Sequence, residues 1–226
     1  MYTLTASHQT DATAHAALVV LQRLLRSDMP RILIGLAGTP GSGKTFVAGQ
    51  LTSDINAIAG THVMLALSMD GFHLPKAALA ALPDPALALA RRGAPWTFDA
   101  AGLAARLAHI RRAAGRAPVD WPDFQHDVGD PVEAAISVPS ATRIVLVEGL
   151  YLLHQADGWD SVARAFDQRW YLDTPLDLAL DRLAQRHMRA WGWSRAQAAA
   201  RIAENDEPNA LLVAGTRTNA DWILRG

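Results

Sequence analysis

The stretch Gly38-Thr39-Pro40-Gly41-Ser42-Gly43-Lys44-Thr45 matches the phosphate-binding loop pattern G-x-x-x-x-G-K-[ST] at every fixed position. Its glycines allow backbone N–H groups to turn towards phosphate oxygens, and its lysine adds a positive charge at the β- and γ-phosphates. The hydroxyl of Thr45 can reach a Mg²⁺ ion that accompanies the nucleotide. The stretch therefore predicts a nucleotide-binding site made of all eight residues, with Lys44 as a catalytic charge and Thr45 as a metal ligand.

The residues on either side place this loop between a strand and a helix. The apolar run Ile32–Ala37 before it is typical of a buried parallel strand. After Thr45, apolar residues recur at helical spacing in residues 46–51. Strand, loop and helix is the setting in which the motif binds phosphate. An ordinary glycine-rich turn between a strand and a helix is the alternative.

Length and composition limit the other possibilities. The 226 residues, of which 50% are hydrophobic and 19% charged, suffice for one α/β domain over residues 1–226 but hardly for a second. The net charge of −1 argues against a nucleic-acid partner, and the absence of cysteine excludes disulfides and thiolate metal sites. No signal peptide or membrane-spanning run is evident, so membrane insertion is not expected and a cytoplasmic location is.

Strands and helices are expected to alternate along the chain, which indicates a parallel sheet with both faces covered. Segments rich in alanine, leucine or proline between them predict a short helix with a loop at residues 75–95 and an irregular or hairpin segment at 118–139. Further strands are predicted at residues 62–67, 143–149, 169–172 and 221–224, and helices at 10–28, 44–58, 99–115, 175–190 and 194–206.

Two carboxylates follow apolar strands directly and so reach the same sheet edge as the phosphate loop. At Asp70, a carboxylate can orient an acceptor hydroxyl and accept its proton, whereas a simple turn at a strand end is the alternative. Glu148 ends the run of residues 144–147 and resembles the Walker-B acid that holds the Mg²⁺ region directly or through water. A solvent-exposed glutamate at a strand terminus is the alternative there.

A basic row is predicted on the helix at residues 175–190, because Arg182, Arg186 and Arg189 follow at i, i+4 and i+7. Arginines on a movable helix can close over the phosphates and neutralise charge in the transition state. Arg182 and Arg186 are the candidates for this role. A solvated basic face is the alternative.

Two histidines lie in loops near these elements. His73 follows Asp70 by three residues, and His126 lies in the irregular segment. Each is a candidate for acceptor contact, and a merely exposed loop histidine is the alternative. The Asp and His residues form no convincing set of metal ligands, so Mg²⁺ is expected to arrive with the nucleotide.

Together these residues resemble the P-loop kinases that include uridine kinase, phosphoribulokinase and bacterial type I pantothenate kinase. The chain is similar to a branch of nucleoside- and sugar-type kinases, some bacterial members of which are labelled fructose transport system kinase, a fructokinase-like name. The likeness covers most of the chain, from about residue 31 to 221. It rests on the phosphate loop and on Met69-Asp70-Gly71-Phe72-His73, Arg91-Arg92-Gly93-Ala94-Pro95 with Thr97-Phe98-Asp99, Phe124-x-His126 with Asp130, Val147-Glu148-Gly149-Leu150-Tyr151, Arg182-x-x-x-Arg186 and Asn205-Asp206-x-x-Asn209.

The resemblance implies an α/β fold of the P-loop NTPase type, with a five-stranded parallel sheet flanked by helices. It also implies a substrate-side insertion at about residues 75–140 and a lid at about 175–205. The implied reaction transfers the γ-phosphoryl group of ATP, with Mg²⁺, to a hydroxyl of a small molecule, with Asp70 as the base. Arg92, His126 and Tyr151 then become candidates for acceptor contacts beside His73.

The acceptor and some alternatives stay open at this point. Phe72-His73 replaces the aromatic pair of better-known members, and neither a uridine pocket nor the pantothenate contacts can be located. A sugar such as fructose, a nucleoside and a pantothenate-like alcohol are all compatible with the sequence. A regulatory NTPase and a non-catalytic nucleotide-binding module are the rival classes, and a homodimer is left open. ATP is favoured over GTP because neither lysine, Lys44 or Lys76, lies in an Asn-Lys-x-Asp element.

Overall fold

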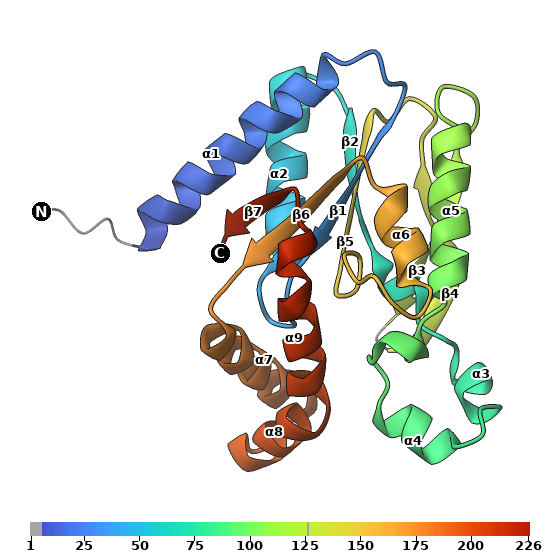
Figure 1. Cartoon of the computed structure of the whole chain (residues 1–226), viewed down its shortest axis with the longest axis vertical. Coiled ribbons are helices and arrows are strands. Elements are labelled where there is room, and N and C mark those ends of the chain that lie inside the picture. Colours follow the sequence, from blue (N-terminus) through green and yellow to red (C-terminus); the bar gives the residue numbers. More distant parts are fainter. Residues whose placement is uncertain (1–5, 126) are drawn as a thin grey trace, which may run out of the picture.

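A five-stranded parallel sheet lies at the centre of the fold, with helices on both faces (Figure 1). The structure, a computed structural model, describes residues 6–125 and 127–226. The strand order is β2-β5-β1-β6-β7, and every neighbouring pair is parallel. The predicted α/β fold with a five-stranded parallel sheet is confirmed. The strands are β1 (Ile32–Ala37), β2 (Met64–Ser68), β5 (Ile144–Gly149), β6 (Gln168–Asp173) and β7 (Trp222–Arg225).

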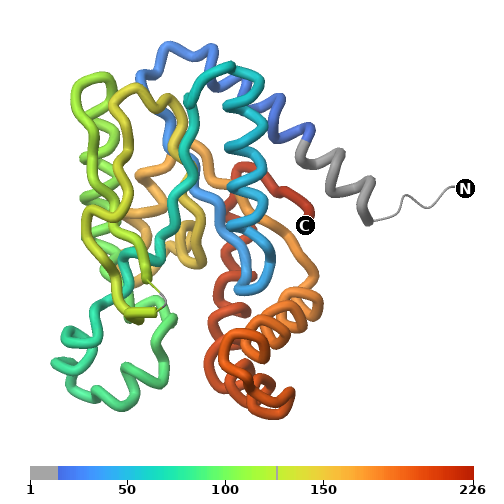
Figure 2. The backbone as a smooth tube through the Cα atoms, turned by 180° about the vertical axis from the view of Figure 1, so that it is seen from behind, coloured from blue at the N-terminus to red at the C-terminus, as the bar shows by residue number. Residues whose placement is uncertain are grey.

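Two apolar cores explain why the central strands read as continuous apolar runs. All six residues of β1 and all six of β5 are buried, as expected of strands covered on both faces. One core packs the sheet against α1 (Ala6–Leu25) and α2 (Lys44–Ala59). The other packs it against α5 (Ala100–Arg112) and α6 (Trp159–Ala165). In agreement, α6 lies in front of the sheet in Figure 1 and α2 lies in front of it in the reverse view of Figure 2.

A two-stranded hairpin forms from β3 (Val119–Gln125) and β4 (Asp130–Val138), as one of the two alternatives for this segment predicted. Its Trp121 is fully buried, and the indole N–H donates to the carbonyl of Ser68 at 2.9 Å. The hairpin is therefore fixed to the carboxyl end of β2, where the sequence places Asp70, the candidate catalytic base.

The remaining helices lie in two groups beyond the carboxyl ends of the strands, at the lower left and lower right of Figure 1. The left group contains α7, α8 and a π-helical turn, η3, which runs directly into α9. The right group contains α3 and α4. Their bounds are α3 (Lys76–Ala80), α4 (Pro85–Ala90), α7 (Leu176–Trp191), α8 (Arg195–Arg201), η3 (Ile202–Asp206) and α9 (Glu207–Gly215), with short 3₁₀ turns at η1 (Met69–Phe72), η2 (Pro95–Thr97) and η4 (Thr216–Asn219).

Several predicted boundaries are corrected. The helix predicted at 10–28 ends at Leu25, because the chain turns at residues 26–28 before β1. The strand predicted at 62–67 runs instead from Met64 to Ser68. Helices α6 and α9 were not predicted. Pro208 lies in the first turn of α9, a position at which proline is common.

Within the described residues, 6–125 and 127–226, no helix is both long and apolar enough to cross a lipid bilayer.

Candidate active site

The phosphate loop joins the end of β1 to the start of α2. Gly41 and Gly43 have φ angles of 79° and 94°, in the left-handed region that favours glycine. A Cβ atom at Gly41 would overlap the carbonyl oxygen of Ala179 on α7. The loop therefore depends on glycine both for its turn and for the close approach of α7.

Two hydroxyls in this loop fit a phosphate ligand. Thr39 and Ser42 are only 3% and 2% exposed, and neither Oγ atom has a hydrogen-bond partner among the described residues. Buried hydroxyls without a partner are uncommon because their desolvation is not compensated. The loop also leads into the N-terminus of the 16-residue helix α2, whose free N–H groups and dipole favour an anion. These features fit the triphosphate of a nucleotide.

Lys44 is nearly buried beside this cradle. Its side chain is 8% exposed, and Nζ donates to the carbonyl of Thr39 at 3.0 Å. Burial lowers the pKa of Lys44, the charges of Glu148 and Asp70 raise it, and the charge of Arg186 lowers it. Lys44 thus lies within electrostatic reach of the two predicted carboxylates and of one predicted lid arginine.

Glu148 lies at the carboxyl end of β5 and contacts the start of α2. The Thr45 hydroxyl donates to Glu148 Oε1 at 2.8 Å. Burial raises the pKa of Glu148; Lys44 lowers it, Asp70 raises it, and hydrogen bonds from Thr45 and Ser68 lower it. The structure therefore brings the Lys44, Glu148 and Asp70 side chains to one sheet edge. Glu148 is 8% exposed, so the alternative of a solvent-exposed glutamate does not apply.

Asp70 is held by the turn that follows β2. Ser68 pairs with Glu148 in the sheet register, and its hydroxyl accepts the backbone N–H of Asp70 at 3.1 Å. A Cβ atom on the next residue, Gly71, would overlap the carbonyl of Pro122 in the hairpin. The glycine lets the hairpin approach the backbone closely, so the position of Asp70 is fixed from two sides.

His73 forms part of an aromatic wall beside Asp70. Its Nδ1 lies 2.8 Å from the carbonyl oxygen of Asp70. The imidazole centroid lies 4.0 Å from the ring of Phe98 and 4.8 Å from that of Phe124. His126 lies outside the described residues.

Arg92 connects this wall to the hairpin. Its guanidinium donates to Asp130 Oδ1 at 2.8 Å and to the carbonyl of Gly129 at 2.6 Å, and it lies 5.2 Å from the centroid of Phe124. Two of its five N–H donors therefore hold the hairpin, and a third bonds to the carbonyl of Leu74. The Nε atom of Arg92 is buried without a partner among the described residues.

Tyr151 lies behind the wall and has no exposed surface. Its hydroxyl donates to the carbonyl of Gly93 at 2.5 Å, and burial raises its pKa. As placed here, Tyr151 supports the segment at Gly93 and does not itself face solvent. A contact between Tyr151 and the acceptor stays a prediction.

Arg182 and Arg186 are exposed on α7 and form no hydrogen bond or ion pair with another described residue. They differ in one respect, because only Arg186 influences the pKa of Lys44. Arg186 therefore lies nearer the phosphate loop, while the placement of Arg182 also fits a solvated face.

Sequence reasoning missed several residues around this site. His187 is 5% exposed and pairs with Asp206 at 2.8 Å, and Arg91 donates to the carbonyl of Glu204 at 2.7 Å. Nothing in their local pattern distinguishes them from a helical histidine and a surface arginine.

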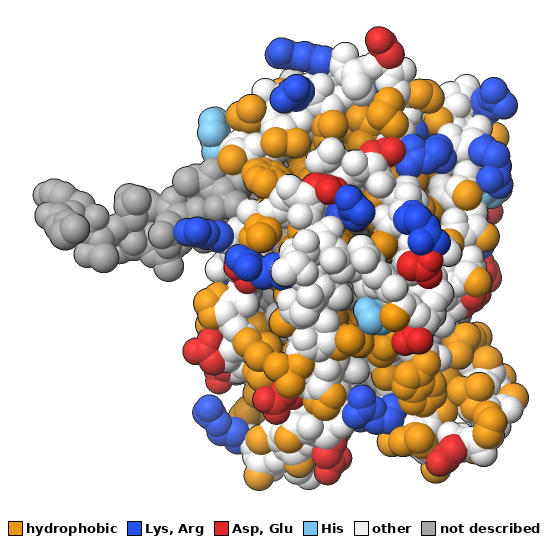
Figure 3. All heavy atoms as spheres, in the orientation of Figure 1, with side chains coloured by type: hydrophobic (Ala, Val, Ile, Leu, Met, Phe, Trp, Pro, Cys, Tyr) orange, Lys and Arg blue, Asp and Glu red, His pale blue; other side chains and the backbone are white. Residues whose placement is uncertain are grey.

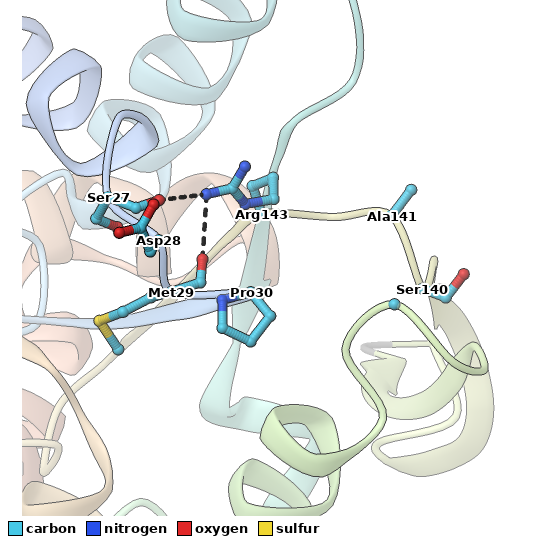
Figure 4. A pocket seen from close by; sticks show the side chains of 8 residues that line it. Ser27, Asp28, Met29, Pro30, Ser140, Ala141 and Arg143 are labelled. Atoms are coloured by element: carbon cyan, nitrogen blue, oxygen red, sulfur yellow. Dashed lines mark hydrogen bonds between the residues drawn. The ribbon is translucent and has the colours of Figure 1, made fainter.

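A pocket lies at the opposite edge of the sheet, before β1 and β5 begin (Figure 4). Arg143 lines it, and its guanidinium donates to the carbonyls of Ser27 at 2.9 Å and Met29 at 3.1 Å. Because ligands of such sheets bind beyond the carboxyl ends of the strands, this hollow is not part of the candidate active site.

Comparison with known proteins identifies the family. The model of the phosphoribulokinase / uridine kinase family matches residues 33–225, which is most of the chain. The chain belongs to this family. The resemblance inferred from its motifs is confirmed, and the protein is an ATP-dependent kinase.

Two relatives are similar in sequence to this chain over most of its length. The Schizosaccharomyces pombe protein named "Putative uridine kinase C227.14" is 34% identical over 196 residues, covering 86% of this chain and 83% of its own. A crystal structure described as a "putative fructose transport system kinase" from Silicibacter sp. TM1040 is 33% identical, with a TM-score of 0.80, covering 93% of this chain and 98% of its own. The YFH7 structure from Saccharomyces cerevisiae, 20% identical with a TM-score of 0.79 and covering 96% of this chain and 98% of its own, shows the same fold.

Gly41 provides a test of the loop. Gly41→Ala forces a left-handed residue with a Cβ atom against the carbonyl of Ala179, so we expect the affinity for Mg-ATP to fall by at least about tenfold. Gly49→Ala, in the open middle of α2, is the matched control and should bind as the parent does, with stability raised by about 1 kcal/mol. Isothermal titration with Mg-ATP and thermal unfolding measure both. Equal affinity in the two variants would show that the loop geometry does not matter for binding.

Proposed function

We propose that this kinase transfers the γ-phosphoryl group of Mg-ATP to a hydroxyl of a small molecule, with Asp70 as the catalytic base. The observation that supports this best is the convergence of Asp70, Lys44 and Glu148, each of which shifts the pKa of at least one of the others. Phosphoryl transfer to a hydroxyl requires a positive charge at the phosphates, an acid beside the metal ion and a base for the hydroxyl proton. Lys44, Glu148 and Asp70 are the candidates for these three roles.

The donor half of the site is proposed to lie on the phosphate loop, residues 38–45. Its N–H groups and Lys44 would hold the β- and γ-phosphates and stabilise the charge that develops during transfer. Thr45 and Glu148 offer hard oxygen ligands suited to Mg²⁺. The ion is proposed to take its other ligands from phosphate and water. When bound, Mg²⁺ would neutralise charge on the phosphates.

The acceptor half is proposed to lie between Asp70 and the substrate-side insertion, residues 75–140. Asp70 would orient the attacking hydroxyl and accept its proton. His73 and the neighbouring aromatic rings would form one wall, and Arg92, through its remaining Nε, and His126 stay proposed contacts. Arg182 and Arg186, in a lid over residues 175–205, would close on the phosphates and exclude water.

For the acceptor we propose a sugar, with fructose as the first candidate. The support is the description of the 33% identical Silicibacter protein as a putative fructose transport system kinase. A nucleoside is the second candidate, supported by the name of the S. pombe relative. The aromatic wall suits either class, because rings stack on the apolar face of a sugar as well as on a base.

An acceptor screen tests this proposal. ADP formation from Mg-ATP would be measured alone and with fructose, other sugars, nucleosides, glycerate and pantothenate. We expect one class to raise the rate at least about a hundredfold over the acceptor-free rate. Stimulation by nucleosides alone would overturn the sugar assignment and keep the kinase. A high rate without any acceptor would instead favour the regulatory NTPase.

The assembly and location also remain proposals: a single domain over residues 1–226, in the cytoplasm, with a homodimer open. Leu87 and Leu89 on α4 are about half exposed, at 51% and 49%, and Figure 3 shows apolar side chains gathered over the region of α3 and α4. Light scattering would decide between a monomer and a dimer.

A further inference from the structure

The segment at Asn205 and Asp206 has no part in the proposed chemistry, yet it joins the two helical groups that flank the site. It belongs to the π-helical turn η3, and such turns are often found at functional positions. It lies against the backbone just after α4, in the proposed insertion. Three hydrogen bonds link the two sides: Arg91 Nη1 to the Glu204 carbonyl at 2.7 Å, Arg201 Nη1 to the Ala90 carbonyl at 2.7 Å, and Asn205 Nδ2 to the Arg92 carbonyl at 3.2 Å.

Local backbone geometry explains why these carbonyls are available. Ala90 is the last residue of α4, and the final carbonyls of a helix have no donor within it. Glu204 precedes Pro208 by four residues, and a proline has no N–H to donate to it. Each side thus presents a backbone carbonyl to an arginine of the other side.

These three hydrogen bonds form what we call the junction, and Asn205 is its buried residue. Its side chain is 2% exposed, and Nδ2 is also 3.4 Å from Asp206 Oδ1. Gly93, with a φ angle of 105°, would place a Cβ atom 3.9 Å from the amide nitrogens of both Asn205 and Asn209. Since the Gly93 carbonyl accepts from Tyr151, this insertion segment is held from both sides.

Asp206 extends the junction to the helix over the phosphate loop. Its carboxylate lies 2.8 Å from His187 Nε2 on α7, and the imidazole stacks on Trp191 at 4.6 Å between centroids and 17° between planes. The residue before His187 is Arg186, the lid arginine that lies near Lys44. Asn205 and Asp206 therefore connect the insertion backbone to α7 through neighbouring side chains.

We propose that Asn205 and Asp206 are positioning residues that couple α7 to the acceptor-side insertion, so that nucleotide binding at the loop also orders residues 85–95. This inference rests on the proposed function, because it takes the loop as the nucleotide site and the insertion as the acceptor side. By linkage, if bound nucleotide raises the affinity for an acceptor by some factor, bound acceptor raises the affinity for the nucleotide by that same factor. Asn205 and Asp206 contact α7 through side chains, whereas the nucleotide would act on α7 through the phosphate loop.

Hydrogen–deuterium exchange of the full chain tests the coupling without a known acceptor. The probe is Mg²⁺ with AMP-PNP, a non-hydrolysable ATP analogue. In the parent protein we expect AMP-PNP to slow exchange in α7 and in residues 85–95, each by at least about fivefold. In Asn205→Ala the slowing in α7 should remain, while that in residues 85–95 should fall below about twofold. A purely structural role would change exchange with and without nucleotide alike.

Two arginines of α8 give a second, surface test in case Asn205→Ala does not fold. Arg201→Ala removes a bond to the insertion, whereas Arg195→Ala removes an ion pair with Asp181 on α7 and leaves the junction intact. Arg201→Ala should lose at least half of the protection of residues 85–95, and Arg195→Ala should keep it.

Two results would overturn the inference. One is full protection of residues 85–95 in both Asn205→Ala and Arg201→Ala; the other is protection of α7 alone in the parent protein. Neither result would contradict the proposed nucleotide site. If calorimetry detects no AMP-PNP binding to the parent protein, the proposed function itself is contradicted, and the inference falls with it.

Discussion

Asp70→Asn is expected to abolish phosphoryl transfer while leaving nucleotide binding intact. The amide keeps the shape of the carboxylate but cannot accept the proton of the acceptor hydroxyl, so kcat should fall by about 10²–10⁴. The affinity for Mg-ATP should stay equal or increase slightly. Asp70 lies close enough to Lys44 and Glu148 to alter their pKa values, and its removal takes a negative charge away from the anionic ligand.

Calorimetry with Mg-ATP and coupled turnover with the responding acceptor measure the two effects separately. Asp84→Asn is the matched control. Asp84 caps α4 by accepting the N–H of Leu87, and asparagine caps a helix equally well. Full turnover in Asp70→Asn would remove the base role, and parallel loss of nucleotide binding would assign Asp70 to the donor half instead.

Lys44→Met is expected to remove both tight nucleotide binding and catalysis. The lysine is nearly buried and within electrostatic reach of Glu148 and Asp70, so without its charge these two carboxylates would act on the triphosphate unopposed. Loss of one preorganised charge at the transferred group reduces kcat by about 10²–10³. The affinity for Mg-ATP should fall by at least about tenfold in addition.

The chain offers one matched control, because Lys76 is its only other lysine. Lys76 lies on α3 and donates to the carbonyl of Val128, away from the loop. Lys76→Met should keep kcat within about twofold, since exposed polar contacts contribute little. Equal losses in the two variants would mean that general positive charge, and not the loop lysine, supports activity.

Most of the donor half of the site could be predicted from the sequence because its signals are local. The phosphate loop is one continuous segment, and the strand before it is apolar throughout. Asp70 follows one apolar strand and Glu148 ends another, so a parallel sheet brings them to one edge, and the register of Ser68 with Glu148 agrees. Strand order and the position of α9 were not predictable in this way.

The acceptor half was less predictable because its contacts join distant segments through backbone carbonyls. Arg92 was predicted only as a possible acceptor contact, and it donates to Asp130 and Gly129. Tyr151 looked like a substrate contact but is buried and supports Gly93. No residue pattern shows which carbonyls a fold leaves without a donor, so these roles required the structure.

The role of the junction at Asn205 could not be predicted from the sequence either. The sequence singled out the Asn-Asp segment only by resemblance, without a role for it. Its part in the structure follows from bonds between the end of α4 and the turn η3, whose residues Ala90 and Glu204 lie 114 positions apart (204 − 90). Only their proximity in the fold lets an arginine from each side bond to the carbonyl of the other.

The most direct test of the account is to identify where the γ-phosphoryl group goes. The parent protein would be incubated with Mg-ATP and the acceptor that stimulates it best, and the acceptor would be analysed by mass spectrometry beside the ADP formed. We predict one phosphate ester of the acceptor for each ADP, and almost none with Asp70→Asn. ADP accompanied by free inorganic phosphate and an unchanged acceptor would contradict the account and identify the protein as an NTPase.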